Sequence, residues 1–272
     1  ESGKLKHYCH IGTGNYNPKT SRIYEDFGLF TSSPEVGRDV TKLFNVLSGY
    51  AIETDYDRLL VAPLQLRAGL LERIEREAEH ARAGRPSGIK LKANSMVDES
   101  IIDALYLASQ AGVPIEVWVR GICSIRAGVP GLSESIQVRS VLGRYLEHSR
   151  IYAFENDGEQ EVFIGSADLM HRNLDRRIEV LVQLSEREHL ARVNRFFEFA
   201  FSDEVSSWRM LPNGAWQRRV ISEEGELLPD LQDLVMADRT EARARRARWV
   251  AISSRPAQSA GDACPSRAVG RV

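Results

Sequence analysis

The chain has 272 residues, of which 43% are hydrophobic and 27% charged, a composition typical of a globular protein of one or two domains. Its formal net charge of -2 argues against a generally basic nucleic-acid-binding protein, so any anion site must be local. No apolar run of about 18 residues occurs, so we expect no transmembrane segment, and the widely separated cysteines suggest neither a zinc cluster nor a disulfide framework.

The first part of the chain, residues 1–58, combines two expected strands with a glycine-rich turn. A strand is expected over Leu5–Ile11, and the turn Gly12-Thr13-Gly14-Asn15 follows it. Glycines and a hydroxyl after a strand can bring backbone N–H groups close to a phosphate, although most such turns are only turns. The second strand is expected over Thr20–Phe30. Its alternation places three side chains on one face: Arg22, Tyr24 and Asp26.

A helix is expected over residues 34–49, with Ser33 as its cap and Pro34 in its first turn. Its apolar stripe is expected to be core and consists of Val36, Val40, Leu43, Phe44 and Leu47. The following polar segment lacks a strong period, which predicts a domain boundary near Arg58.

Residues 59–119 alternate between strands and helices. Apolar runs predict strands over Leu59–Ala62, Ile89–Ala93 and Ile115–Val119. Helical periodicity predicts the helices Leu66–Ala83 and Asp98–Ala111 between them, and this alternation predicts a parallel sheet covered by helices. In the first helix we expect Leu70, Ile74 and Ala78 to point inward and Glu72, Arg73, Glu75, Arg76, Glu77 and Glu79 to point outward.

Polar residues follow two of these strands at their carboxyl ends, where ligands bind in open α/β sheets. Arg120 follows the third of these strands, and the adjacent Gly121 permits close backbone approach. Lys92 and Asn94 stand at the end of the second strand. On position alone, a role in a site and a plain surface role for Arg120 carry equal weight.

The stretch Leu146–Glu179 carries the strongest chemical signal. His148 and Arg150 are two residues apart, so on a strand both side chains would point to one face. A turn at residues 156–158 and a second apolar run at residues 161–164 predict a hairpin.

This hairpin leads into Gly165-Ser166-Ala167-Asp168 and the arginine-rich segment Arg172–Glu179. An imidazole beside fixed guanidinium groups suits phosphoryl chemistry, with the imidazole either handling protons or accepting the phosphoryl group. Arg139, Ser140 and Arg144 precede the hairpin and are expected to project into the same space.

The last part of the chain is interpreted as structural and then disordered. We expect a helix over Glu186–Phe201 and a hairpin over Trp208–Val220. From about Thr240 the composition turns Arg/Ala-rich, and disorder is expected from about Ser253. For the basic run Arg239–Arg248, a solvated helix end or tail is favoured over a polyanion site.

Two distant segments repeat one pattern. Residues 11–15 and 164–168 both contain Ile, Gly, a hydroxyl residue, a small residue and Asn or Asp. An acidic residue, Asp26 or Glu179, follows at the same distance in both. The repeat indicates two related half-sites across a pseudo-twofold axis. The two carboxylates would either orient histidine rings or pair with arginines.

Five sequence blocks in order then resemble one family. They are HIGTGNYNPKTSRIYEDFGLFT, KANSMVDESIIDALYLAS, VRGICSI, VRSVLGRYLEHSRIYAF and IGSADLMHRNLDRRIEVL. Over about residues 1–243 the chain resembles the C-terminal half of polyphosphate kinases. The resemblance implies an α/β fold of phospholipase D-like lobes, with a mixed sheet flanked by helices. Residues 1–58 would end the first lobe, 59–243 would form the complete second lobe, and 244–272 would be a basic, then disordered tail.

The same resemblance implies reversible transfer of the terminal phosphate of ATP to inorganic polyphosphate through a phosphohistidine. The family's phosphorylated histidine precedes the GTGN turn, so the chain is expected to be a fragment that is inactive alone. The resemblance assigns catalysis to His148 and Arg150, and ATP or ADP binding to Tyr24, Arg120 and His148. It suggests five polyphosphate contacts: Arg139, Arg144, Arg172, Arg176 and Arg177.

Further expectations concern cofactor, partners and location. Mg²⁺ ligands are expected upstream of this chain and none within it. Polyphosphate and nucleotide are the expected partners, nucleic acid is not, and the full-length enzyme is expected to be a cytoplasmic homo-oligomer, with peripheral contact to the inner membrane left open. Met170-His171 departs from the family, where a tryptophan and a proline are expected. The alternative functions are a phospholipase D-like phosphodiesterase and a non-catalytic nucleotide- or polyphosphate-binding fragment.

Overall fold

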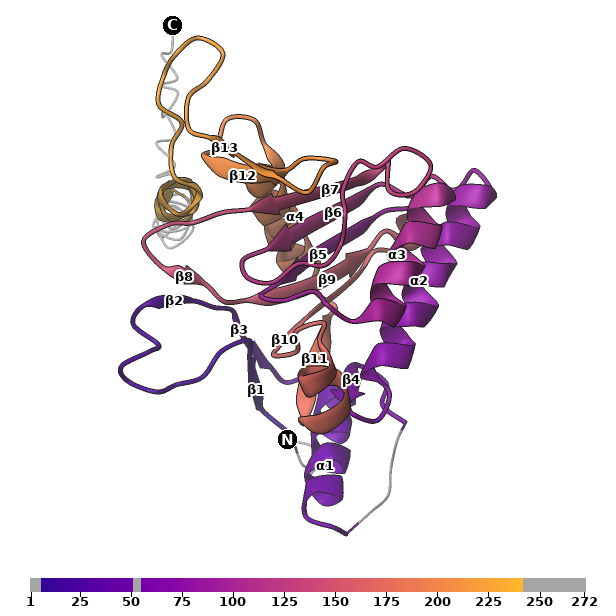
Figure 1. Ribbon diagram of the computed structural model, residues 1–272. Helices are drawn as coiled ribbons and strands as arrows, with labels where there is room; N and C mark the ends of the chain where they lie inside the picture. Colours follow the sequence, from indigo (N-terminus) through magenta and orange to yellow (C-terminus); the bar gives the residue numbers. More distant parts are fainter. Residues whose placement is uncertain (1–5, 51–54, 242–272) are drawn as a thin grey trace, which may run out of the picture. The chain divides into compact units, whose positions relative to one another are not determined.

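A nine-stranded mixed sheet organises residues 1–234 in the computed structural model, which describes residues 6–50 and 55–241 (Figure 1). Its order is β13 (Trp216–Arg219), β12 (Ser207–Met210), β7 (Ile136–Ser140), β6 (Ile115–Val119), β5 (Ile89–Ala93), β9 (Arg150–Phe154), β10 (Glu161–Gly165), β11 (Glu179–Leu184) and β4 (Leu59–Ala62). Residues 235–272 form a second unit, of which residues 235–241 are described and are helical.

The sheet is parallel only in its middle. β5, β6 and β7 pair in parallel, whereas β9 pairs antiparallel with β5 and begins a series of antiparallel neighbours that ends at β4. The predicted bounds of β4, β5 and β6 are confirmed. The expectation that these three strands would form a simple parallel sheet is wrong, because β9, β10 and β11 lie between β5 and β4.

Helices cover both faces of the sheet. On one face, α2 (Leu66–Arg82) and α3 (Glu99–Gln110) bury an apolar core that includes Leu70, Ile74 and Val117. Trp118, the next residue of β6, points to the other face and contacts Phe196 of α4 (Arg187–Phe201) at 4.9 Å between ring centroids. Successive side chains of β6 therefore pack against helices on opposite faces of the sheet.

The N-terminal segment is built from shorter elements than predicted. β1 (Cys9–Gly12) pairs antiparallel with β3 (Gly28–Thr31), and β2 (Tyr24–Glu25) pairs in parallel with β8 (Leu146–Glu147). The single strand expected over residues 20–30 is thus wrong. Asp26 and Phe27 separate β2 from β3, because Phe27 bonds through its backbone N–H to the hydroxyl of Thr13 at 2.9 Å.

Helix α1 (Pro34–Leu47) confirms the predicted helix but only part of its core. Ser33 caps it, with its hydroxyl accepting from the backbone N–H of Val36. Val36 and Leu43 are buried, whereas Phe44 and Leu47 are 63% and 46% exposed, so their assignment to the core is wrong. Among the described residues, nothing covers the face of α1 that carries these two side chains.

Glu77 of α2 is fully buried, although its helix position predicts an outward side chain. Its carboxylate accepts from the backbone N–H groups of Gly88 at 2.9 Å and Asn156 at 2.8 Å. It thereby closes the loop before β5 and the β9–β10 turn, where Asn156 and Asp157 have positive φ. Burial raises the pKa of Glu77 in spite of these bonds.

The remaining predicted elements are found. β9 and β10 form the expected hairpin, the expected helix is α4, which buries Val193, Phe196, Phe197 and Ala200, and β12 pairs with β13. No helix within the described ranges has the length and apolar character needed to cross a membrane. The predicted disorder from Ser253 lies outside the described residues.

Asp39 of α1 anchors the start of β4. Its buried carboxylate accepts from the backbone N–H groups of Asp57 at 3.1 Å, Arg58 at 2.6 Å and Leu59 at 3.1 Å. Replacing Asp39 with Ala leaves these donors without acceptors, and we expect the free energy of unfolding to fall by about 3 kcal/mol. Denaturant unfolding followed by circular dichroism measures it.

Asp57→Ala is the matched control. It keeps the backbone N–H that bonds to Asp39 and removes a side chain that forms an exposed ion pair with Arg38 at 3.3 Å. Its expected effect is below about 1 kcal/mol. Equal losses in the two variants would show that the backbone bonds to Asp39 contribute little.

Candidate functional site

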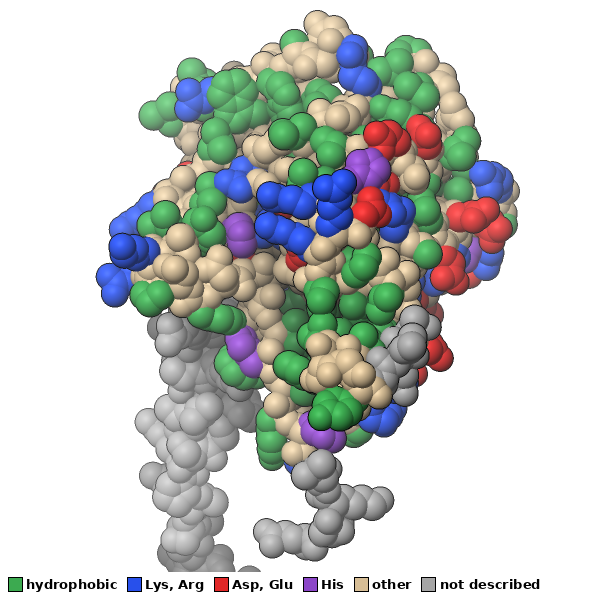
Figure 2. Space-filling model, turned by 60° about the horizontal axis from the view of Figure 1, so that its bottom comes forward, with side chains coloured by type: hydrophobic (Ala, Val, Ile, Leu, Met, Phe, Trp, Pro, Cys, Tyr) green, Lys and Arg blue, Asp and Glu red, His purple; other side chains and the backbone are tan. Residues whose placement is uncertain are grey.

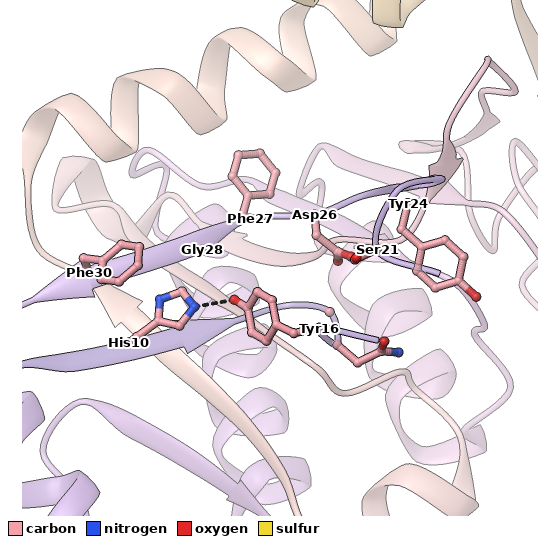
Figure 3. Close-up of a pocket in the computed structure, with 10 residues that line it drawn as sticks. His10, Tyr16, Ser21, Tyr24, Asp26, Phe27, Gly28 and Phe30 are labelled. Atoms are coloured by element: carbon pink, nitrogen blue, oxygen red, sulfur yellow. Dashed lines mark hydrogen bonds between the residues drawn. The ribbon is translucent and has the colours of Figure 1, made fainter. Parts of the chain in front are cut away.

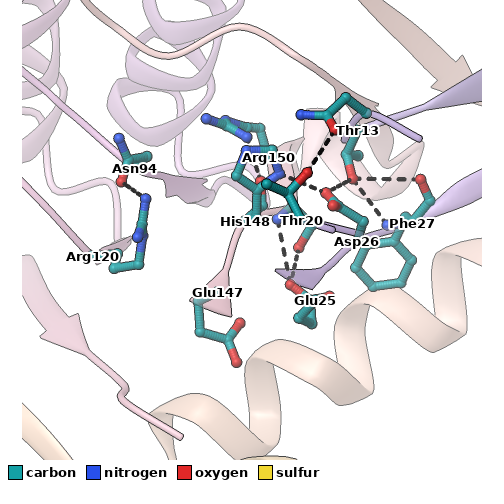
Figure 4. A network of polar contacts seen from close by, with 12 residues as sticks. Thr13, Thr20, Glu25, Asp26, Phe27, Asn94, Arg120, Glu147, His148 and Arg150 are labelled. Atoms are coloured by element: carbon teal, nitrogen blue, oxygen red, sulfur yellow. Dashed lines mark hydrogen bonds and ion pairs between the residues drawn. The ribbon is translucent and has the colours of Figure 1, made fainter. Parts of the chain in front are cut away.

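His148 lies between β8 and β9, where the N-terminal segment meets the large sheet (Figure 4). Its Nδ1 lies 2.9 Å from Oδ1 of Asp26, and its ring contacts Tyr24 at 4.6 Å between centroids. Because a carboxylate accepts, the imidazole donates through Nδ1–H, and Nε2 is left for a ligand or a proton. Of the two roles considered for Asp26, orienting a histidine is the one found.

The GTGN turn holds Asp26 in place. Thr13 is 1% exposed, and its hydroxyl donates to Asp26 at 2.7 Å. The backbone N–H of Thr13 also bonds to the carbonyl of Phe27 at 2.9 Å. A Cβ on Gly14 would collide with the carboxylate of Asp26, so glycine is required there. The turn therefore positions a carboxylate, which the sequence did not predict for it.

The second copy of the repeat has the same local bonds. Ser166 donates through its hydroxyl to Glu179 at 2.5 Å, and its N–H bonds to the carbonyl of Val180 at 3.1 Å. The N–H of Val180 returns to the Ser166 hydroxyl, as Phe27 does to Thr13. A Cβ on Gly165 would collide with the carbonyl of Val180, which explains the glycine. The two half-sites thus match in geometry as well as in sequence.

Arg150 is a buried brace beneath His148. Its Nη2 pairs with Asp168 at 2.9 Å, and its Nη1 donates to the backbone carbonyl of His148 at 2.5 Å. Asp168 also accepts from the backbone N–H of Asn94 at 2.7 Å. Since His148 precedes β9, the two side chains do not share a strand face as predicted. Arg150 is only 6% exposed, so it holds the backbone and is not open to a ligand.

Arg120 stands at the carboxyl end of β6, where the sequence placed it. Its Nη2 donates to the side chain of Asn94, and its buried Nε–H has no hydrogen-bond partner. Burial lowers the pKa of Arg120, and the nearby charge of Arg150 lowers it further, although a guanidinium remains protonated. No carboxylate within the described ranges forms an ion pair with Arg120, which makes its charge available to an anion.

The other predicted arginines fall into two groups. Arg144, Arg172, Arg176 and Arg177 are exposed. Arg139 is 4% exposed and donates to the carbonyl of Ser202 at 2.7 Å and to Asp203 at 3.1 Å. Its assignment to a surface path for polyphosphate is therefore wrong, because α4 covers it. Figure 2 shows Lys and Arg side chains gathered on one face beside histidines.

A pocket of about 370 Å³ adjoins Tyr24 and Asp26 (Figure 3). His10 lines it, stacked on Phe30 at 4.1 Å between ring centroids and hydrogen-bonded to the Tyr16 hydroxyl. The sequence did not single out His10. It missed the pocket because the lining aromatic residues come from three separate short segments with no common period. The pairing of His10 with Phe30 across β1 and β3 becomes visible only in the structure.

Within residues 6–50 and 55–241, no three His, Cys, Asp or Glu side chains are grouped to hold a metal ion.

The structure defines an α/β protein whose mixed sheet carries an imidazole oriented by Asp26 and, at the end of β6, the guanidinium of Arg120. The comparisons agree with this class. The family model described as Polyphosphate kinase C-terminal domain 2 matches residues 59–227, and the model for C-terminal domain 1 matches residues 1–53. The chain belongs to the polyphosphate kinase family.

Relatives and a solved structure give the same result. The polyphosphate kinase of Streptomyces coelicolor is 56% identical over 246 residues, which is 90% of this chain and 32% of the relative. That of Mycobacterium tuberculosis is 50% identical over 240 residues, or 87% and 32%. The crystal structure of polyphosphate kinase from Porphyromonas gingivalis matches with a TM-score of 0.83 and 32% identity, over 90% of this chain and 38% of that one.

These matches confirm the predicted family and the α/β class with a mixed sheet flanked by helices. The chain spans about a third of the length of these curated relatives, 32% in each case. The division into domains at residues 58 and 243 stays a prediction, as do the site assignments. The tail after residue 241 lies outside the described part.

His171 forms an exposed charge network. Its Nδ1 lies 2.9 Å from Asp175 and its Nε2 lies 2.8 Å from Glu99. These bonds, that to Asp175 first, raise the pKa of His171 above its ordinary 6.5. Bonds from Arg67 and His171 hold the pKa of Asp175 at about 2, so it stays ionised near neutral pH.

We expect His171→Gln to lower the melting temperature most below pH 6.5, the ordinary pKa. A raised pKa in the folded state stabilises the fold fully below the unfolded pKa. This contribution disappears as pH rises through the folded pKa. Thermal melts of both proteins from about pH 5.5 to pH 9 measure the difference. A difference independent of pH would show that His171 does not act through its charge.

Proposed function

We propose that this chain forms the nucleotide side of a polyphosphate kinase active site, which transfers the terminal phosphate of ATP reversibly to polyphosphate through a phosphohistidine. The observation that carries the proposal is the hydrogen bond from His148 to Asp26, which joins the acidic residue of the first repeat to the β8–β9 segment, where the His148 ring contacts Tyr24. ATP or ADP and inorganic polyphosphate are the proposed ligands, in a cytoplasmic homo-oligomeric enzyme. Ligands for an accompanying Mg²⁺ are proposed to lie outside this chain.

His148 is proposed to move protons and not to carry the phosphoryl group. Asp26 fixes its Nδ1–H, so Nε2 is the atom that can accept or donate a proton at the migrating phosphate. The phosphoryl acceptor is proposed to be a second histidine, upstream in the complete enzyme. Glu179, held by Ser166 and by Asn173 at 2.7 Å, is then the equivalent of Asp26 for that histidine.

The main requirement of this chemistry is that positively charged protein groups lie close to the negative oxygens of the transferring phosphoryl group. Arg120 is proposed to bind nucleotide phosphate, because its guanidinium has a donor without a partner. The Tyr24 ring, tilted against His148, is proposed to contact the nucleotide. Exposed Arg144, Arg172, Arg176 and Arg177 are proposed to contact polyphosphate. Arg150 contributes by holding the His148 backbone.

In the complete enzyme, we expect His148→Gln to lower kcat at least about 100-fold, the usual effect of losing a general acid or base. The melting temperature should change little, because His148 is partly exposed. Formation of labelled polyphosphate from labelled ATP measures turnover. His171→Gln is the control, since its imidazole is exposed and outside the site. Full turnover of His148→Gln would overturn this role, and diester cleavage without polyphosphate would favour the phosphodiesterase alternative.

In the isolated chain, we expect ADP to bind without phosphorylation of histidine. Arg120→Met should weaken ADP binding at least about tenfold, because a charge-assisted bond contributes about 1.5–3 kcal/mol. Calorimetric titration measures the affinity. Arg126→Met is the matched control: the Arg126 side chain is exposed and donates through its Nη2 to the carbonyl of Pro212. Equal affinities of the two variants, or stoichiometric phosphate on His148, would contradict the assignment.

A further inference from the structure

A buried lysine lies directly under the site. Lys92 of β5 is 2% exposed, although the sequence placed it at the open end of the sheet. Its Nζ lies 2.9 Å from Glu25, 3.0 Å from Glu147 and 2.7 Å from the hydroxyl of Ser149. One ammonium therefore meets acceptors of three residues, one in the N-terminal segment and two on either side of His148, and the Ser149 hydroxyl also donates to Glu25 at 2.7 Å.

Aromatic rings close the other side of this ammonium. The Trp118 ring centroid lies 4.6 Å from Nζ and that of Phe196 lies 5.5 Å away. Burial alone would lower the pKa of Lys92, but the carboxylates of Glu25 and Glu147 outweigh it and raise the pKa. Lys92 is thus a permanent cation without access to water, and such a cation persists only with close anionic partners.

The partners of Lys92 belong to the two strands that carry the site. Glu25 of β2 pairs with Glu147 of β8 in a parallel ladder of two residues each. Side chains alternate along a strand, so the residues next to Glu25 and Glu147 point to the opposite side. Three of those neighbours are residues of the site: Tyr24, Asp26 and His148. In Figure 4, Glu25 and Glu147 accordingly lie below His148 in the view.

The ladder itself is weak. The bonds that continue it are Leu146 N–H to the carbonyl of Ile23 at 2.8 Å and His148 N–H to the carbonyl of Glu25 at 3.2 Å. A two-stranded ribbon is marginally stable in water, and this one is shorter than most. Its register therefore needs support from side chains, and Lys92 bonds to both strands at the level of the pair.

We propose that Lys92 is a positioning residue, which joins Glu25 to Glu147 and Ser149 and thereby sets the register in which Tyr24 and Asp26 meet His148. Lys92 touches no ligand in this proposal and acts through the two strands. The inference rests on the proposed function only for its consequence on nucleotide binding. The geometric part stands without it.

Lys92→Met tests the proposal, because methionine keeps the apolar stem and removes the ammonium. The readout is the nuclear Overhauser effect between the ring protons of Tyr24 and His148 in selectively labelled protein, whose ring centroids lie 4.6 Å apart. We expect this signal to be lost in Lys92→Met, with methyl signals of the α2–α3 core unchanged. ADP affinity should fall at least about tenfold. A folded Lys92→Met with the wild-type ring signal and ADP affinity would overturn the proposal.

Lys90→Met is the matched control. Lys90 lies two residues earlier on the same face of β5, pairs with Glu116 at 3.5 Å and packs over Phe197 at 6.0 Å. We expect it to keep both the ring signal and ADP affinity. Equal loss in both variants would indicate general weakening of β5 and would overturn a specific role for Lys92.

A second variant covers the case that Lys92→Met does not fold, because two unpaired carboxylates would then face each other. Lys92→Met with Glu25→Gln and Glu147→Gln removes that charge and should fold. We expect its ring signal to be weakened, since no ammonium then joins residue 25 to residue 147 and only the direct bond between Ser149 and residue 25 is left. A wild-type signal there would overturn the proposal. If the wild-type chain shows the ring signal but binds no ADP, the proposed nucleotide site is refuted. The ring signals of the variants then still test the positioning role of Lys92.

Discussion

The pairing of β2 with β8 is the constraint on which the site depends. Two residues from each strand bring Tyr24 and Asp26 against His148, which lies more than a hundred positions along the chain. Few backbone bonds hold this pairing, so its register rests on side chains below it and on the turn that carries Asp26. A site of this kind is assembled by long-range contacts, and its geometry is set by a network of buried hydrogen bonds and ion pairs.

The sequence predicts those parts of the fold whose residues meet one kind of environment. The bounds of β4, β5 and β6 were predicted correctly, because β4 is apolar throughout and apolar residues recur at every second position of β5 and β6. Their neighbours were not predictable, since an apolar strand can pair with any other. The predictions for Glu77 and Phe44 were wrong for a related reason. Helix periodicity indicates which side of the helix a residue faces, but not which elements pack against that side.

The site shows the same division. His148, Arg120 and Tyr24 were predicted as site residues from motifs and the family resemblance; in the structure His148 contacts Tyr24, and Arg120 lies at the end of β6. Arg139 and Arg150 share the chemistry of the exposed arginines, yet each has a carboxylate partner and a carbonyl partner inside the fold. No local pattern separates a guanidinium that is already neutralised from one that is available. Whether a guanidinium is neutralised depends on partners that are distant in sequence.

The choice of cation at each buried position follows from geometry. Arg150 meets both oxygens of Asp168 in one plane, which suits a planar guanidinium. Lys92 meets Glu25, Glu147 and Ser149, which come from different strands and directions, and a tetrahedral ammonium with three donors serves such a set. An arginine fork at this position would align with one carboxylate and leave the other without its cation. In a chain that uses only arginine after residue 92, lysine at this point is therefore required by the junction it holds together.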